Sequence, residues 1–120
     1  METIQFDDFK KVEIRIGKIL SAEKLPDSNK LLKLEVDFGA TTSAQGSGES
    51  REKRIILSGI AKFYTPEQII GKLCPFVVNL LAKKIGELES QGMILCADGI
   101  ESGPVLLHPD KEVNPGSIVK

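Results

Sequence analysis

Two adjacent lysines, Lys83 and Lys84, lie within residues 79–95. The same segment holds an asparagine, two glutamates, a serine and a glutamine, which can all form hydrogen bonds. Ammonium groups are point charges that suit phosphate oxygens, and the amide and hydroxyl groups around them can bond to sugars, phosphates or unstacked bases. Gly92 and Met93 then open an apolar run, so a polar segment here leads into a buried strand. These residue types favour contact with a nucleic acid, although the local pattern also fits a solvated amphipathic helix.

A third lysine, Lys30, ends the turn-forming segment LPDSNK at residues 25–30. Pro26 fixes its own φ angle, and the short polar side chains after it can bond to their own backbone, which is typical of a turn. If the loops around Lys30 and Lys83 lie at one end of a barrel, three ammonium groups converge on one rim. A single lysine is more simply explained as a solvated surface charge, so the interpretation depends on this convergence.

Catalytic and metal-binding patterns are missing from the sequence. His108 is the only histidine, which excludes a metal site with two histidine ligands, and we interpret it as a surface or strand-end residue. The Gly-rich run AQGSGES at residues 44–50 lacks the Gly-Lys-Ser/Thr ending of a phosphate-binding loop. Glu87 and Glu89 lie close together, but nothing else marks an acid–base pair. We therefore expect neither an enzyme nor a cofactor.

The composition fits one domain, residues 1–120, with one hydrophobic core. Of the 120 residues, 41% are hydrophobic and only 5% are aromatic, which favours a β-rich interior packed from Ile, Leu and Val. Sixteen Lys and Arg residues balance 17 Asp and Glu residues and leave a formal charge of -1. Any surface that binds a polyanion must therefore be local.

The two cysteines and the start of the chain bear on the cellular compartment. Cys74 and Cys96 have apolar neighbours and belong to no Cys-x-x-Cys or Cys/His cluster, so we expect two buried free thiols, with a disulfide or a ligand pair as the alternative. No stretch approaches the roughly 18 apolar residues of a membrane span. The acidic start METIQFDD lacks the layout of a secretory signal. These features predict a cytoplasmic protein with no membrane partner.

Alternation of apolar and charged residues predicts the first two strands. From Val12 to Ile16 every second residue is apolar, and after a bend at Gly17 the strand continues to Leu20. Residues 31–38 alternate in the same way. The apolar residues of this second strand share one face and are Leu32, Leu34, Val36 and Phe38.

The segment between the second and third strands has a different composition. Residues 39–53 are rich in Gly, Ser and Thr and have no apolar period, so we expect a flexible connection with a dispensable insert at about 40–52. The third strand is predicted at residues 54–60, where the apolar residues return. A loop of this length is often functional or disordered, and we expect disorder here.

A short helix within residues 64–71 is marked at both ends. Thr65 is a suitable N-cap, Pro66 suits the first helical position, and Gln68 can complete a capping box. Gly71 provides the stop. The apolar run of residues 73–80 then predicts the fourth strand, in which Pro75 indicates either the start of the strand or an edge position.

The remaining strands complete a recognisable order of elements. Residues 92–97 predict a fifth strand, and residues 103–109 and 113–119 predict short β pieces divided by Pro and Gly. Five short strands with one helix between the third and fourth are typical of an all-β OB-fold, a five-stranded Greek-key barrel. In that fold the face of strands 2 and 3 and the loops after strands 1 and 4 carry ligand contacts.

Four segments of the sequence, taken in order, also resemble a known family. They are VEIRIGKILSAEKLPDSNKLLKLEVDFG, ILSGIAKFYTPEQIIGK, NLLAKKIGELESQGMILCA and GPVLLHPDKEVNPGSIV. They resemble the tRNA-binding domain at the C-terminus of methionyl-tRNA synthetases, which also occurs as a free-standing tRNA-binding protein and in a cytokine precursor of the multisynthetase complex. The resemblance runs from Phe6 to Val119 and omits only the insert.

This resemblance implies an OB-fold, usually a homodimer, that binds the outer corner of tRNA by its shape rather than by its anticodon. It implies tRNA contacts at Lys30, Asn79, Lys83, Lys84, Ser90 and Met93. The chain also departs from the family, which commonly has Lys-Pro before a basic pair that contains arginine. Here the residues are Leu81-Ala82-Lys83-Lys84, so the loop loses the stiffness of proline and the bidentate phosphate fork of arginine.

Two functions from different classes fit these observations. The first is a non-catalytic tRNA-binding module that raises the local tRNA concentration for an aminoacyl-tRNA synthetase, methionyl in the first instance, either in cis or with a separate catalytic chain. The alternative is a peptide-binding export chaperone of the same barrel family, which would use an apolar groove. We also expect a homodimer, because Ile4, Phe6 and Phe9 have no place inside so small a barrel.

Overall fold

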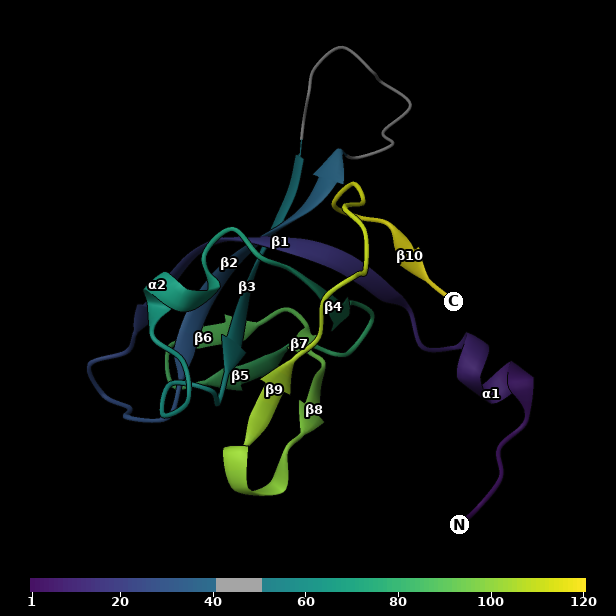
Figure 1. The fold of residues 1–120 in the computed structure, drawn as a ribbon, viewed down its shortest axis with the longest axis horizontal. Coiled ribbons are helices and arrows are strands. Elements are labelled where there is room, and N and C mark those ends of the chain that lie inside the picture. Colours follow the sequence, from purple (N-terminus) through teal and green to yellow (C-terminus); the bar gives the residue numbers. More distant parts are fainter. Residues whose placement is uncertain (41–50) are drawn as a thin grey trace.

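The computed structural model describes residues 1–40 and 51–120, and Figure 1 shows a curled sheet with short elements around it. The predicted helix and five strands are present, together with further short elements. In chain order the elements are α1 (Phe6–Lys10), β1 (Ile14–Lys24), β2 (Leu32–Ala40), β3 (Arg51–Ser58), α2 (Pro66–Ile69), β4 (Leu73–Val77), β5 (Lys83–Ile85), β6 (Leu88–Ser90), β7 (Met93–Ile94), β8 (Cys96–Asp98), the 3₁₀ turn η1 (Ile100–Ser102), β9 (Pro104–Leu106) and β10 (Ile118–Val119).

The main sheet is antiparallel and has the strand order β3-β2-β1-β4-β7, with β10 also paired to β1. The long strand β1 organises it: its first half, from Ile14 to Lys18, pairs with β4, and its second half, from Lys18 to Lys24, pairs with β2. Figure 1 shows β1 crossing the whole molecule as the sheet curls around it. The predicted five-stranded OB-type barrel is therefore confirmed, and β7 is its fifth strand.

The core lies inside this curled sheet. The predicted inner face of β2 is confirmed, since Leu32, Leu34, Val36 and Phe38 are all buried. They pack with Ile19, Ile56 and Phe76 from neighbouring strands, and the rings of Phe38 and Phe76 meet edge to face at 5.4 Å. Branched aliphatic side chains thus fill most of the barrel, as the scarcity of aromatic residues predicts.

Gly17 lies within β1 opposite Cys74, directly before Lys18, where the pairing of β1 changes from β4 to β2. A Cβ atom on Gly17 would come within 2.4 Å of Val36 Cγ1 and 2.8 Å of Phe38 Cε1. A glycine is needed because two core side chains occupy the space above its backbone. Pro75 is neither at the start of its strand nor at an edge, because it is the middle residue of β4, which lies between β1 and β7. Its carbonyl accepts the Leu95 amide just past the end of β7.

Several predicted boundaries differ from the structure. β2 extends to Ala40 and β3 begins at Arg51, and these two residues are opposite each other, so the ends of the supposed connection are strands. The prediction of flexibility for residues 41–50 lies outside the described residues. The fourth strand ends at Val77, and the fifth is divided at Leu95 into β7 and β8. The helix at Pro66 agrees with the prediction, with Gln68 Oε1 accepting the Thr65 amide at 2.8 Å.

Both cysteines are free thiols, as expected, although only Cys74 is fully buried. Burial raises the pKa of Cys74 to about 12; the nearby Cys96 adds to this effect, and the charge of Lys72 opposes it. Burial also raises the pKa of Cys96. Within residues 1–40 and 51–120, no helix is long and apolar enough to cross a membrane.

Candidate nucleic-acid interface

Lys83 and Lys84 lie on a β-hairpin and not in the predicted loop. β5 and β6 pair with the register Lys83↔Ser90 and Lys84↔Glu89, and Gly86 takes a positive φ of 63° in the turn. Only three residues of each strand are paired, and their charged side chains face water, so the apolar pattern of a buried strand is missing. Consecutive strand residues point to opposite faces, so Lys83 and Lys84 present their ammonium groups in different directions.

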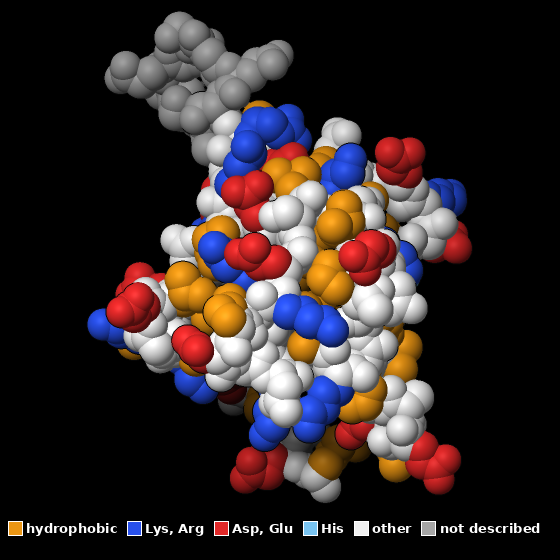
Figure 2. All heavy atoms as spheres, turned by 90° about the vertical axis from the view of Figure 1, so that its left-hand side faces the viewer, with side chains coloured by type: hydrophobic (Ala, Val, Ile, Leu, Met, Phe, Trp, Pro, Cys, Tyr) orange, Lys and Arg blue, Asp and Glu red, His pale blue; other side chains and the backbone are white. Residues whose placement is uncertain are grey.

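The electrostatic character of this hairpin is local. Both lysines are exposed, but Glu87 and Glu89 lie on the same hairpin, so the charges of residues 83–90 cancel. Lys84 and Glu89 also line one shallow depression beside Ile55 of β3. Figure 2 shows this side of the molecule, where basic side chains are interspersed with acidic and apolar ones. Any contact with a polyanion here depends on individual ammonium groups rather than on a continuous basic surface.

Lys30 lies in the loop between β1 and β2 and is exposed. Its carbonyl accepts the Ala61 amide at 3.0 Å, just beyond the end of β3. The hairpin reaches the same end of β3, because Ser90 Oγ accepts the Leu57 amide at 3.0 Å. In Figure 1 the β1–β2 loop and the hairpin both lie toward the left-hand side of the barrel. The two loops therefore adjoin one end of one strand.

Two of the predicted contact residues already have partners within the protein. Ser90 is buried, and its hydroxyl accepts from Leu57 and donates to the Gly92 carbonyl at 2.9 Å. The Asn79 side chain bonds to the backbone of Glu13 and Lys11, ahead of β1. Their polar groups stabilise the fold, so they are less available to an external ligand than their residue types suggest.

Met93 differs from these two residues because its side chain is 47% exposed. It begins β7 opposite Val77, and the next residue, Ile94, is buried. Gly92 precedes it with a φ of 156°, and a Cβ atom on Gly92 would come within 2.9 Å of the Val77 carbonyl oxygen. The backbone at Gly92 therefore packs closely against β4, and Met93 lies on the surface at the start of β7.

Sequence reasoning missed Arg54 and the leucines that precede the hairpin. Arg54 looks like one more charge before a strand, yet its Nη1 donates to the carbonyls of Val78 and Gln91 and its guanidinium lies 5.7 Å from the centre of the Phe38 ring. Leu80 and Leu81 are 50% and 95% exposed. Nothing in the sequence separates these leucines from the apolar run of the fourth strand.

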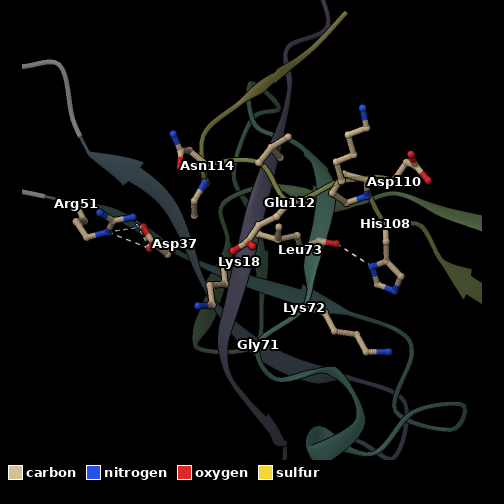
Figure 3. A pocket seen from close by; sticks show the side chains of 14 residues that line it. Lys18, Asp37, Arg51, Gly71, Lys72, Leu73, His108, Asp110, Glu112 and Asn114 are labelled. Carbon is tan, nitrogen blue, oxygen red and sulfur yellow. Dashed lines mark hydrogen bonds and ion pairs between the residues drawn. The ribbon is translucent and has the colours of Figure 1, made fainter.

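A second cavity lies away from the hairpin (Figure 3). It has a volume of about 550 Å³ between β1, the start of β4 and the segment after β9. On one side Arg51 Nη2 lies 2.9 Å from Asp37 Oδ2, and on the other His108 Nδ1 bonds to the Leu73 carbonyl at 2.8 Å. Charged side chains of both signs line it, so it selects for no one charge. They include Lys18, Lys72, Lys111, Asp110 and Glu112.

The buried carboxylate of Asp37 in this cavity is fully partnered. Burial alone would raise its pKa, but the hydrogen bonds from Arg51 and from the Gly39 amide, with the charges of Arg51 and Lys53, outweigh burial and lower the pKa below its ordinary value. The single histidine of the sequence led us to expect no metal site with two histidine ligands. Within the described ranges, no group of three or more His, Cys, Asp or Glu side chains could hold a metal ion.

Comparison with known proteins identifies the family. A family model described as a putative tRNA binding domain matches residues 14–118. The chain belongs to this tRNA-binding domain family. The methionine–tRNA ligases of Parabacteroides distasonis and Archaeoglobus fulgidus are 42% and 46% identical to it, over 99% and 98% of this chain. In both cases the match covers 16% of the relative, so the chain spans about one sixth of the length of the synthetases it matches.

Solved structures agree with this assignment. A MetRS related protein from Pyrococcus horikoshii is 38% identical, with a TM-score of 0.84 and complete coverage of both chains. The chaperone CsaA from Bacillus anthracis is 28% identical, with a TM-score of 0.80 over 99% of this chain and 100% of that one. The resemblance to the tRNA-binding region of methionyl-tRNA synthetases is therefore confirmed, and the chaperone shows that a second function exists on a similar fold.

Proposed function

We propose that this chain is a non-catalytic tRNA-binding module that assists an aminoacyl-tRNA synthetase, methionyl-tRNA synthetase in the first instance, in cis or in trans. The observation that carries the proposal is the β5–β6 hairpin, which presents two exposed ammonium groups from a base anchored to the barrel. Phosphate contacts of this kind position a nucleic acid without reading its sequence. By holding tRNA near a catalytic chain, the module raises the local substrate concentration. Such a role belongs in the cytoplasm.

Four of the six candidate residues are suited to direct contact. Lys30, Lys83 and Lys84 are exposed and can reach phosphates, and Met93 can pack against a ribose or a base at the rim. Asn79 and Ser90 contribute indirectly, because their side chains are engaged inside the protein. Because both signs of charge lie on this face, tRNA binding depends on matching the three ammonium groups to the spacing of phosphates on a folded RNA.

The chaperone function is the second candidate, and one observation favours it. Leu80 and Leu81, shortly before the lysines in the chain, are exposed, and so is Met93 at the start of β7. An apolar surface suits a peptide better than it suits a phosphate backbone. An excess of an unfolded apolar peptide should leave tRNA binding unchanged if tRNA is the ligand. Strong binding of the peptide together with no binding of tRNA would favour the chaperone.

The direct test is a salt titration of tRNA binding with wild type and the Lys83→Ala/Lys84→Ala variant. If both lysines displace counterions, the slope of log affinity against log salt should flatten by about 1.4 to 1.8, at ~0.7 to 0.9 for each phosphate contact. The matched control is Lys72→Ala/Lys111→Ala, which removes the same charge from the second cavity. The control should have the wild-type slope, and circular dichroism should show that both variants are folded.

The choice of RNA tests recognition by shape. The hairpin variant should bind two tRNAs with different anticodons more weakly than wild type does, and by the same factor. An unstructured RNA of equal length should bind poorly to wild type and to both variants. An unchanged slope in the hairpin variant, or a wild-type preference for the unstructured strand, would refute the proposed role.

A homodimer is part of the same proposal. The helix α1 buries none of its residues, and Figure 1 shows it standing away from the barrel. Ile4 and Phe6 are 67% and 70% exposed, and Phe9 is 41% exposed. A second copy could cover these side chains, and symmetric pairing is the commonest arrangement for such a surface.

A further inference from the structure

The barrel is closed by side chains and not by a continuous ladder. β3 and β7 are the two ends of the sheet order, and neither pairs with the other along its length in the described part of the chain. An open strand edge leaves backbone amides and carbonyls without partners. Three residues supply hydrogen bonds across this gap: Arg54 on β3, Ser90 at the end of β6 and Gln91 between β6 and β7.

Gln91 replaces a strand at Ile55. Its backbone amide donates to the Ile55 carbonyl at 2.9 Å, and its side-chain Oε1 accepts the Ile55 amide, also at 2.9 Å. One residue thus satisfies both backbone groups of Ile55, which would otherwise pair with a neighbouring strand. Ser90 Oγ accepts a hydrogen bond from the Leu57 amide, and the Ser90 hydroxyl donates one to the Gly92 carbonyl.

Arg54 joins the two ends of the segment that carries the hairpin. Its Nη1 donates to the Val78 carbonyl at 2.5 Å, where the chain leaves β4, and to the Gln91 carbonyl at 3.1 Å, where the chain returns from β6. Its Nε pairs with Glu52 at 2.6 Å, which orients the guanidinium on β3. The Arg54 side chain therefore holds both ends of the segment 78–91 against β3.

We infer that Arg54, Ser90 and Gln91 form a clamp that sets the orientation of the β5–β6 hairpin, and that these three residues position Lys83 and Lys84 instead of contacting RNA. The orientation of the hairpin is a property of the free protein, and its effect on RNA binding rests on the function proposed above. A hairpin held at its base presents both ammonium groups in a fixed relation, so less conformational freedom is lost when tRNA binds. A loosened hairpin must lose that freedom during binding.

The first arm of the test needs no RNA. Ser90→Ala removes the acceptor of the Leu57 amide, and Gln91→Met removes the acceptor of the Ile55 amide while keeping a similar side-chain length. Amide exchange measured by NMR should be roughly tenfold faster at Leu57 and at Ile55 respectively, as expected for one lost hydrogen bond. Backbone order parameters of residues 83–90 should fall in both variants. The conservative Ser90→Thr keeps the hydroxyl and should restore both readings.

The second arm is a double-mutant cycle on tRNA affinity. Ser90→Ala should weaken binding by roughly tenfold and flatten the salt dependence when the two lysines are present, because positioning acts through them. In the Lys83→Ala/Lys84→Ala background the same substitution should have no further effect. The matched control is Ser117→Ala, which loses an internal hydrogen bond to the Asn114 carbonyl far from the hairpin and should leave tRNA affinity unchanged.

Each result has a separate meaning. Unchanged amide exchange and order parameters in both Ser90→Ala and Gln91→Met would overturn the clamp. An equal loss of tRNA affinity in the two backgrounds, with an unchanged salt slope, would show that Ser90 touches the RNA directly and would overturn its positioning role. Failure of the wild type to bind tRNA would instead overturn the proposed function, and the first arm would still decide whether the clamp orients the hairpin.

Discussion

The side-chain Oδ1 of Asn79 accepts a hydrogen bond from the backbone amide of Glu13, 66 residues earlier in the chain, at 2.8 Å. The Nδ2 of the same side chain donates to the Lys11 carbonyl at 2.6 Å. One amide side chain therefore joins the end of β4 to the segment that links α1 to β1. This pairing explains a polar residue at this position without any ligand.

The first prediction follows from that pairing. Asn79→Ala should lower the free energy of unfolding by about 1 kcal/mol, because two hydrogen bonds near the surface are lost, and should speed amide exchange at Glu13. Asn79→Asp keeps the acceptor and loses the donor, so its effect should be smaller. Urea denaturation and amide exchange provide the measurements. A loss of tRNA affinity at unchanged stability would show instead that Asn79 is an RNA contact, as the family resemblance implies.

The second prediction concerns assembly. At micromolar concentration the protein should sediment as a homodimer, because Phe6 and Phe9 are too exposed for a stable free surface. Phe6→Glu/Phe9→Glu should give a folded monomer, since the helix that carries them buries no residue of its own. Leu81→Glu is the control, with an even more exposed apolar side chain on another part of the surface, and it should remain dimeric. A monomeric wild type would remove this proposal.

The third prediction is that residues 41–50 can be replaced by a short turn. Ala40 and Arg51 lie opposite each other at the open end of the β2–β3 ladder, so an Asn-Gly turn can join them in place of residues 41–50. The free energy of unfolding should change by less than about 1 kcal/mol, because the entropy of loop closure varies slowly with length. Thermal unfolding and tRNA affinity should both stay near wild type. A large decrease in either would give the insert a role.

The fourth prediction is a decrease in stability at high pH. The pKa of Cys74 is about 12 in the folded protein, against an ordinary value of 9.0. Between these values the folded thiol keeps its proton while the unfolded thiol loses it. The contribution of Cys74 is therefore complete below pH 9 and is lost as the pH rises toward 12, at up to about 1.4 kcal/mol per pH unit. Lysines titrate in the same range, so the measurement is the difference between wild type and Cys74→Ala in urea denaturation from pH 8 to 11. If the free energy of unfolding changes with pH equally in wild type and in Cys74→Ala, the prediction is wrong.

Regular elements were predictable where local pattern decides them. The alternation in residues 31–38 predicted β2 because one face of that strand is buried in the barrel. The helix at Pro66 was predictable because its N-cap, its first residue and its stop lie within one short stretch, residues 65–71. The hairpin β5–β6 was not predicted because most of its side chains are exposed and it lacks an apolar period. The helix α1 escaped because it is five residues long and buries nothing.

The partners of the candidate residues within the protein were not predictable from the sequence. Ser90 and Asn79 were expected to face a ligand, and their partners lie 33 and 66 residues away in the chain. A sequence shows that a side chain can form hydrogen bonds, but it does not show which distant backbone groups need them. Gly17 illustrates the same limit, since the side chains that exclude a Cβ atom there belong to β2.

The way the hairpin is attached also bears on how this surface can change over generations. Residues 80–89 contribute no buried side chain, while the residues that anchor the segment stand at its two ends. Substitutions between those anchors alter what the surface offers to a ligand and leave the core as it was. Selection for a different RNA, or for a peptide, can therefore act on this segment without first having to restore a damaged fold.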